Sequence, residues 1–327
     1  MIRNSVTLQI SLSPNDYRHA KHLLHNQLDV LSNHVNEVLL TVDTRKSAGR
    51  FGLNWDENQT SLTILLKSIQ DKYPSVVIKN VEYHNDVEAA ISNFFFGKTT
   101  IPTKDFRGGP FYSYFYGLYY ATSQYVLHID SDMFLGGNSQ TWISEALTLF
   151  HENKTLFTVS PLPGPPHPQQ QLISQNIIKQ LNAPYAFELS GFSTRVFMID
   201  KSIFLKEKLQ LSKPSFKNQL KALLEGNSNA DLPEHLFSNF IKAHALKRVD
   251  FLGNQPGLWT LHPPYRTEAF YENLPTLIQR VEINELPDKQ KGFYDIIDEV
   301  CDWTEARDKI IKNKWWRRFL SKKFGLK

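Results

Sequence analysis

Two carboxylates separated by one residue, Asp130 and Asp132, are the strongest sign of chemistry in this 327-residue sequence. They follow the apolar segment Tyr125–Ile129, so we expect them at the end of a buried strand. Two carboxylates at one strand end repel each other and are costly to bury, and a hard divalent cation relieves both problems. Oxygen ligands suit Mg²⁺ or Mn²⁺, which can neutralise the charge of a departing diphosphate. A solvated turn is the plainer alternative, because Asp and Ser are common turn residues.

Strands and helices are expected to alternate around this pair. The expected strands cover residues 6–12, 37–43, 76–83, 125–129, 156–160 and 249–252, with a strand pair within 187–204. The expected helices cover residues 16–33, 58–72, 111–123, 141–152, 215–225 and 233–245. Such alternation predicts βαβ units and an α/β fold with a mainly parallel sheet. Ligands of such sheets bind beside the carboxyl ends of the strands, where both aspartates are expected. The proline-rich segment 161–168 is expected to be a surface loop.

The segment from Gly117 to Asp132, GLYYATSQYVLHIDSD, resembles the core of family 2-type glycosyltransferases of the GT-A fold. In that family a helix, an apolar strand and a D-x-D motif follow one another in this order. The resemblance extends over residues 5–135. It implies a Rossmann-like, mainly parallel sheet flanked by helices. It further implies a GT-A domain over residues 1–267, with a nucleotide-sugar-binding half (1–135) and an acceptor-binding half (136–267), followed by a C-terminal helical extension over 268–327.

The resemblance also implies roles for the strand-end residues. Asp43, after the second strand, would contact the base or the ribose of the nucleotide. Asp130 and Ser131 would lie against the ribose or the metal, and Asp132 would be the direct metal ligand. A simple strand-end cap is the alternative role of Asp43.

Two loops contain residues suited to a diphosphate. Glycine permits close backbone approach, the start of a helix favours anions, and arginine binds phosphate in a bidentate manner. The candidates for nucleotide-sugar contact are therefore Arg45, Arg107, Gly108 and Gly109. Solvated basic loops are the alternative interpretation.

Transfer to a hydroxyl requires a base, and the candidates are Asp231 and Glu234 at the start of an expected helix. The resembled family often has its catalytic carboxylate at this point, although as a Glu-Asp pair that this sequence lacks. Pro233 suits the first helical turn and would make Asp231 the N-cap residue. Because Asp231 has that structural role, we expect Glu234 to be the base.

His262 is the candidate third metal ligand, beside Asp130 and Asp132. It lies in a segment rich in Trp and Pro, and several GT-A enzymes complete their metal site with a late histidine. An imidazole ligand would favour Mn²⁺ over Mg²⁺. A structural hydrogen bond is the alternative role. Nearby Arg266 is expected to pair with a phosphate or with a carboxylate in the core.

The charge of the chain is unevenly distributed. The net formal charge is +4, yet residues 309–327 contain eight Lys or Arg and no acid, so the remainder is acidic. Aromatic and apolar residues among these bases predict an amphipathic helix at an anionic membrane surface. The single cysteine, Cys301, and the lack of a signal peptide or a long apolar run predict a cytoplasmic protein, peripheral on the inner face of the membrane. Nucleic-acid binding is not expected, because the body has no basic stripe.

These observations and the resemblance predict an inverting, metal-dependent hexosyltransferase of glycan biosynthesis. Its donor would be a UDP- or GDP-sugar, and its acceptor a hydroxyl of a glycan or a lipid-linked glycan. A retaining GT-A transferase, a sugar-phosphate nucleotidyltransferase and an inactive membrane-docking scaffold of the same fold are the alternatives. The nucleotidyltransferase is disfavoured, because residues 11–14 (SLSP) are not the Gly-rich segment with a Lys that such enzymes carry near the N-terminus.

Overall fold

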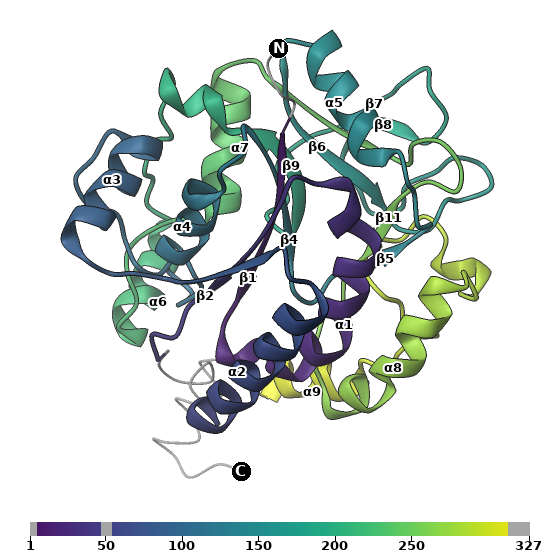
Figure 1. Ribbon diagram of the computed structural model, residues 1–327, viewed down its shortest axis with the longest axis horizontal. Coiled ribbons are helices and arrows are strands. Elements are labelled where there is room, and N and C mark those ends of the chain that lie inside the picture. Colours follow the sequence, from purple (N-terminus) through teal and green to yellow (C-terminus); the bar gives the residue numbers. More distant parts are fainter. Residues whose placement is uncertain (1–4, 47–53, 313–327) are drawn as a thin grey trace.

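The computed structural model describes residues 5–46 and 54–312, which form a large sheet between two layers of helices (Figure 1). The strands are β1 (Val6–Leu12), β2 (Glu37–Val42), β3 (Val76–Asn80), β4 (Tyr125–Asp130), β5 (Phe134–Gly136), β6 (Leu156–Pro163), β7 (Ile177–Gln180), β8 (Ala186–Leu189), β9 (Val196–Asp200), β10 (Lys247–Phe251) and β11 (Trp259–Leu261). The helices are α1 (Tyr17–Leu31), α2 (Trp55–Lys72), α3 (Asn85–Phe96), α4 (Tyr112–Tyr120), α5 (Trp142–Glu152), α6 (Phe216–Glu225), α7 (Pro233–Ala243), α8 (Glu268–Glu282) and α9 (Thr304–Lys312).

The strands follow the order β3-β2-β1-β4-β9-β6-β10-β8-β7, and β11 joins β5 to the end of β6. Strands β3, β2, β1 and β4 are mutually parallel, so their carboxyl ends lie along one edge. Strand β9 is antiparallel to both β4 and β6, and β10 is again parallel to β6. The predicted α/β class, with a mainly parallel sheet and helices at the C-terminal end, is confirmed.

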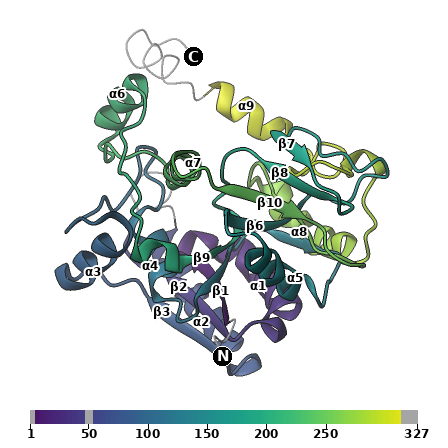
Figure 2. The same cartoon turned by 90° about the horizontal axis from the view of Figure 1, so that it is seen from above.

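The alternation of side chains along β1 shows how the two helical layers differ. Leu8, Ile10 and Leu12 point to the layer that contains α1, α2 and α5. The opposite layer contains α3, α4 and α7, whose core is rich in Phe and Tyr. Figure 2 shows the sheet between these layers from above. Because side chains of a strand alternate, the polar residues of β1 face α4.

Gly117 in α4 allows this helix to approach the polar face of β1. A Cβ atom at position 117 would lie 2.4 Å from the side-chain nitrogen of Gln9 and 3.1 Å from the hydroxyl of Thr41. Only glycine therefore fits between the helix and the two strands. The close approach seals the buried polar side chains beneath α4 from water.

The prediction of a surface loop over residues 161–168 is wrong for the first residues of that range. Strand β6 continues through Pro163, and residues 161–165 are buried. Proline lacks an N–H, but Pro161 and Pro163 flank Leu162, whose N–H donates to the carbonyl of Leu258 at 3.2 Å. The N–H of Gly164 donates to Thr260 at 2.9 Å. Leu162 and Gly164 thus donate the backbone hydrogen bonds from this side of β6. Proline is tolerated at the positions between them, because those positions donate no such bond.

The structure also contains helices and strands that the sequence did not predict. Helix α3 is absent from the expected set, and the strands β5, β7 and β11 are too short to stand out in a sequence. Strands β8 and β9 form as expected, although β8 begins at Ala186, one residue before the expected range, and they pair with β10 and β4 rather than with each other. None of the helices within the described ranges has the length and apolar character of a membrane-spanning segment.

Candidate functional site

A cavity of about 270 Å³ opens at the carboxyl ends of β1, β2 and β4. We call it the aspartate cavity, because Asp43, Asp130 and Asp132 line it. Its wall also includes Ser131, Gly108, Gly109 and Arg266. The parallel register of the strands explains why residues from distant parts of the chain converge here. Six of the predicted site residues therefore share one cavity.

Helix α1 holds the turn that carries the two aspartates. Gln27 donates to the carbonyls of Asp130 and Met133 at 3.1 and 2.8 Å. His19 contacts the hydroxyl of Ser131 at 3.0 Å through Nε2. Both α1 side chains are completely buried and lie eight residues apart, on the same face of the helix. The turn is thus fixed from below by two polar side chains.

Asp132 is buried and forms an ion pair with Arg266. Nε of Arg266 donates to Oδ2 of Asp132 at 3.2 Å, and Nη2 of Arg266 donates a second hydrogen bond to the same oxygen. Burial alone would raise the pKa of Asp132, but Arg266, His262 and His19 lower it, so that its pKa lies well below the usual range. Asp132 is therefore a permanent anion, as a cation ligand must be.

The second oxygen of Asp132, Oδ1, is buried and has no hydrogen-bond partner among the described residues. A buried, unpaired carboxylate oxygen is costly. A divalent cation would satisfy it, so this atom fits one ligand of the predicted metal. Within residues 5–46 and 54–312, however, no three side chains of His, Cys, Asp or Glu are arranged to hold a metal ion. The remaining ligands would have to come from side-chain rearrangement, water or a bound phosphate.

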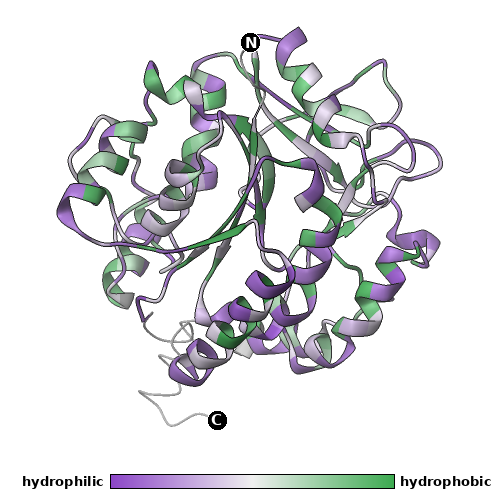
Figure 3. Cartoon of the chain, in the orientation of Figure 1, coloured by the Kyte–Doolittle hydropathy of each residue, from purple (hydrophilic) through white to green (hydrophobic). Residues whose placement is uncertain are grey.

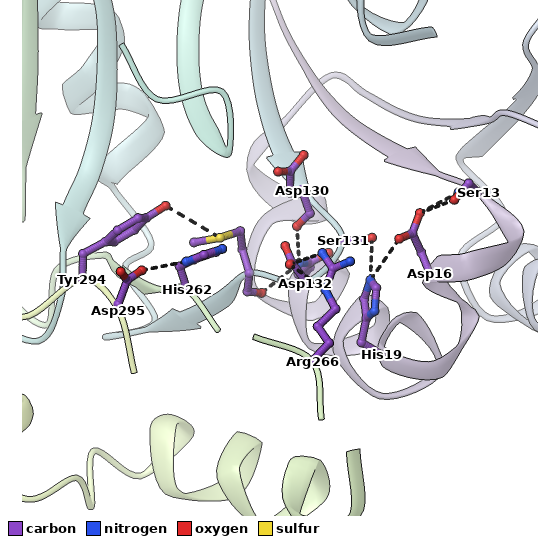
Figure 4. A network of polar contacts seen from close by, with 12 residues as sticks. Ser13, Asp16, His19, Asp130, Ser131, Asp132, His262, Arg266, Tyr294 and Asp295 are labelled. Carbon is purple, nitrogen blue, oxygen red and sulfur yellow. Dashed lines mark hydrogen bonds and ion pairs between the residues drawn. The ribbon is translucent and has the colours of Figure 1, made fainter. Parts of the chain in front are cut away.

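His262 stands apart from the aspartate cavity, which it does not line. Its Nδ1 contacts Oδ1 of Asp295 at 2.7 Å, and its ring stacks on Tyr294 with a centroid distance of 5.8 Å. Figure 4 shows these side chains in one row with Asp132 and Arg266. A carboxylate on one imidazole nitrogen orients the other nitrogen, as is common in metal sites. The structure does not bring His262 and the two aspartates into one ligand set.

Asp130 ends a chain of polar contacts that crosses three strands. The amide nitrogen of Gln9 donates to the hydroxyl of Thr41 at 2.8 Å, so its oxygen faces Nδ1 of His128. Nε2 of His128 lies 3.2 Å from Oδ1 of Asp130. Gln9 and His128 are fully buried, whereas the side chain of Asp130 is 40% exposed. The carboxylate is thus oriented from within the sheet and presented to the cavity.

Asp43 lies where the sequence predicts it, in the wall beyond β2. Its Oδ1 accepts from the N–H of Arg45 at 3.1 Å, and its Oδ2 accepts from the hydroxyl of Tyr83 at 2.9 Å. Arg45 is exposed and places its guanidinium over the Tyr83 ring at 4.8 Å. Asp43 therefore lines the cavity, whereas Arg45 does not.

The glycine loop before α4 uses its amide groups internally. The N–H groups of Arg107 and Gly109 donate to Oδ1 of Asp105 at 2.7 and 2.9 Å, and that of Gly108 donates to the Asp105 carbonyl at 3.0 Å. Gly108 has a φ of +80°, which favours glycine. The side chain of Arg107 is exposed and does not line the cavity. In this conformation the loop offers its glycine surfaces, and not free N–H groups, to a ligand.

A second cavity, of about 330 Å³, lies beyond β9 and is lined by polar residues. We call it the arginine cavity, after Arg195 and Arg248. Arg248 is buried and pairs with Asp250, its Nε donating to Oδ1 at 2.7 Å. The serine, asparagine and glutamine side chains of the wall suit a hydroxyl-rich ligand: Ser174, Gln175, Asn176, Ser190, Ser193 and Ser238.

Glu234 lines the arginine cavity, and Asp231 does not. The expectation that Asp231 is the N-cap of α7 is wrong. Pro233 forces Leu232 into an extended conformation, with φ −68° and ψ 142°, so that Leu232 becomes the N-cap. Asp231 instead accepts from the N–H of Leu232 at 2.9 Å and contacts Nδ1 of His235 at 2.8 Å. The carboxylate of Asp231 is therefore already bound by groups of the protein, whereas the exposed Glu234 lines the cavity.

The two cavities adjoin at Asp130 and Arg195. The N–H of Asp130 donates to the carbonyl of Arg195 at 2.7 Å. Burial opposes the charge of Arg195, but Tyr294, Asp130 and Asp132 raise its pKa, so it stays cationic. Its guanidinium forms no hydrogen bond or ion pair with any of the described residues. The five N–H donors of this charged group are thus available to a ligand that carries acceptors.

The hydroxyl of Tyr114 on α4 lies outside the lining of both cavities. It is buried and has no partner among the described residues. Burial, then the nearby charges of Asp130 and Glu234, raise the pKa of Tyr114 well above its usual range, so the group stays a neutral donor. One carboxylate from each cavity thus contributes to the raised pKa of a single buried hydroxyl.

The sequence did not single out Arg195, Gln27, His19 or Tyr114. Arg195 precedes a strand in an unremarkable segment, and its position depends on the antiparallel pairing of β9 with β4. Gln27 and His19 are polar residues at buried positions of an amphipathic helix, which is the one signal that was available. Arg266, by contrast, meets a carboxylate in the core, one of the two partners expected for it.

Comparison with known proteins yields no match to a family model and none to a curated protein. Among solved structures, residues 1–349 of S. aureus TarS align with 96% of this chain and 77% of that chain, at 12% identity and a TM-score of 0.35. An active-site mutant of LgtC aligns with 74% of this chain and 70% of that chain, at 9% identity and a TM-score of 0.33. Glucosyl-3-phosphoglycerate synthase from Mycobacterium tuberculosis aligns over 85% and 77%, at 8% identity and a TM-score of 0.37. Likenesses this weak assign neither a family nor a function to this chain.

The buried His19 predicts a specific acid sensitivity. Burial, then the charge of Arg266, lowers its pKa from 6.5 to about 4, so unfolding takes up a proton between these values. Stability is therefore lost as pH falls from 6.5 towards 4. His19→Gln keeps a hydrogen-bonding side chain without the titration. Urea unfolding of this variant should lose about 2 kcal/mol less than the wild type between pH 7.5 and pH 5. His84→Gln, at an exposed position, is the control, and an equal pH slope for His19→Gln and wild type would contradict the assignment.

Proposed function

We propose that the protein is a metal-dependent glycosyltransferase that moves a hexosyl group from a nucleoside diphosphate sugar to an acceptor hydroxyl, with inversion. The observation that carries the proposal is the junction of two cavities. One contains a buried strand-end carboxylate with a free oxygen, and the other contains an exposed carboxylate among hydroxyl and amide groups. A charged donor and a polyhydroxyl acceptor would meet at this junction.

In the proposed arrangement the donor nucleotide occupies the aspartate cavity. Asp43 would receive the base or ribose, and Asp130 and Ser131 would contact the ribose. Asp132 would hold Mn²⁺ or Mg²⁺ through Oδ1, with Asp130 and, after rearrangement, His262 as further ligands. Such an ion, when bound, neutralises charge on the diphosphate. Residues 1–135 would form the donor half and 136–267 the acceptor half of the site, except that Arg266 lines the donor side.

Glu234 would act as the base on the acceptor side. Its carboxylate takes the proton from the acceptor hydroxyl as the oxygen forms a bond to the anomeric carbon. The bond between that carbon and the diphosphate breaks, and the diphosphate leaves with the electron pair. Arg266 and the unpaired Arg195 flank the aspartate turn and would stabilise this leaving group. A base in the arginine cavity and a diphosphate in the aspartate cavity would suit inversion.

The basic C-terminal segment lies outside the described residues, apart from the first residues of it that belong to α9. Its predicted amphipathic helix remains a prediction. We propose that it contacts anionic lipid, which would suit a lipid-linked acceptor.

Asp132→Asn tests the metal and donor site. We expect hydrolysis of the nucleotide sugar to fall at least about 100-fold, because the amide is a poor ligand for a hard cation. Thermal stabilisation by a nucleoside diphosphate with Mn²⁺ should disappear, while the far-UV spectrum stays unchanged. Asp56→Asn, on an exposed part of α2, is the matched control. If wild-type hydrolysis persists in EDTA, the metal is rejected and Arg266 becomes the cation that serves the diphosphate.

Glu234→Gln tests the base. Transfer to acceptor should fall at least about 100-fold, because the amide cannot take the proton. Donor affinity, measured by nucleotide-dependent thermal shift, should stay within about twofold, since Glu234 lies outside the aspartate cavity. Asp231→Asn is the discriminating variant. Loss of transfer in that variant, with transfer retained by Glu234→Gln, would reverse the assignment.

Arg195→Gln tests the leaving-group contact. We expect the rate of donor hydrolysis to drop about 10-fold or more, because a charged donor aimed at developing negative charge is removed. The free energy of unfolding should change little, since the guanidinium has no partner to lose among the described residues. Arg307→Gln, which removes a surface ion pair with Asp298 and a long hydrogen bond to Thr304, is the control. Unchanged hydrolysis would remove Arg195 from the reaction.

A further inference from the structure

Helix α6 exposes an unusual amount of apolar surface. Phe216, Leu220, Leu223 and Leu224 are 75%, 48%, 76% and 84% exposed. Their spacing of four, three and one residues places them on one face of the helix. Ala222 is the one residue of α6 found in a hydrophobic cluster of the described chain. An exposed apolar stripe of this kind on a short helix marks an interaction surface.

The charges around the stripe are mostly basic, although α6 itself ends at Glu225. Lys213, Lys217 and Lys221 are exposed on or beside α6. Between Glu207 and Glu225 the chain contains four lysines and no acid, although the chain without its C-terminal segment is acidic overall. Figure 3 shows the mixture of hydrophobic and hydrophilic residues along this helix, and Figure 2 shows the helix at the periphery, beyond α7.

We propose that α6 docks on the surface of an anionic lipid bilayer. Leucine and phenylalanine would enter the interface while the flanking lysines meet lipid phosphates, as in interfacial amphipathic helices. Charge complementarity favours lipid over the two other possible occupants of this surface, which are the C-terminal segment and a second copy of α6. The C-terminal segment carries eight bases and would repel these lysines, and a second copy of α6 would bring like charges together.

The position of α6 connects this surface to the candidate site. Ala222 packs with Phe106 and Leu232, and the amide of Asn227 donates to the carbonyl of Phe106 at 3.3 Å. Phe106 precedes the glycine loop that lines the aspartate cavity. A bilayer bound to α6 would therefore lie near the site. That an acceptor would be drawn from the bilayer rests on the proposed function, whereas the docking itself does not.

Co-sedimentation of the full chain with vesicles tests the proposal. The probes are phosphatidylcholine vesicles with and without phosphatidylglycerol, at about 0.1 M and about 0.5 M NaCl. We expect binding to anionic vesicles, weakened by salt because the lysine contribution is screened. Leu223→Ser combined with Leu224→Ser should reduce the bound fraction at least about fivefold. Ile64→Ser, which removes an apolar side chain that is 68% exposed on α2, is the matched control and should bind like wild type.

Lys213→Gln combined with Lys217→Gln should weaken the preference for anionic over neutral vesicles, and the basic C-terminal segment would supply the preference that remains. Far-UV spectra and unfolding midpoints confirm that each variant is folded, and these readouts do not depend on any transferase activity. Unchanged sedimentation of the leucine variant would overturn the proposal, since binding would then come from elsewhere in the chain. A wild-type dimer that the leucine variant converts to a monomer would also overturn it, by making α6 a protein interface.

Discussion

The ion pair between Asp132 and Arg266 joins the end of β4 to the beginning of the C-terminal helices. It makes a buried carboxylate tolerable at the centre of the molecule, because an unpaired charge there would cost several kcal/mol. It also satisfies one oxygen and leaves the other without a partner among the described residues. The geometry of the aspartate cavity depends on this half-satisfied group. A cation bound here would meet Oδ1 of Asp132, which is already charged, oriented and buried.

Buried polar side chains around Asp132 orient the aspartates of the site. Gln27 and His19 hold the turn from α1, and Gln9 and His128 hold Asp130 from within the sheet. None of these contacts adds much net free energy, because each replaces a bond to water. Their effect is to exclude other conformations of the site, because any conformation that leaves these buried polar groups unpaired has a higher free energy.

Much of the fold could be predicted, because long apolar strands and amphipathic helices have clear periods. The strand over 6–12 and the helix start at Pro233 match the structure residue by residue. The extension of β6 through Pro163 could not be predicted, because it depends on which neighbour each N–H faces. The aspartate turn was predictable from its place after a buried strand. Arg195 was not, since only the antiparallel insertion of β9 beside β4 brings it to the site.

The pairing of residues 293–296 with the segment around His262 has a consequence for where this chain can be divided. His262 donates its N–H to Tyr294 and accepts from Ile296, and Phe270, Leu274 and Trp303 share a hydrophobic cluster with β11. A protein ending near residue 267 would expose that cluster and remove the backbone partners of His262. The segment from α8 to Trp303 therefore folds as part of the body. Anyone who engineers a shorter version, or a fusion at this point, must leave the residues up to Trp303 in place.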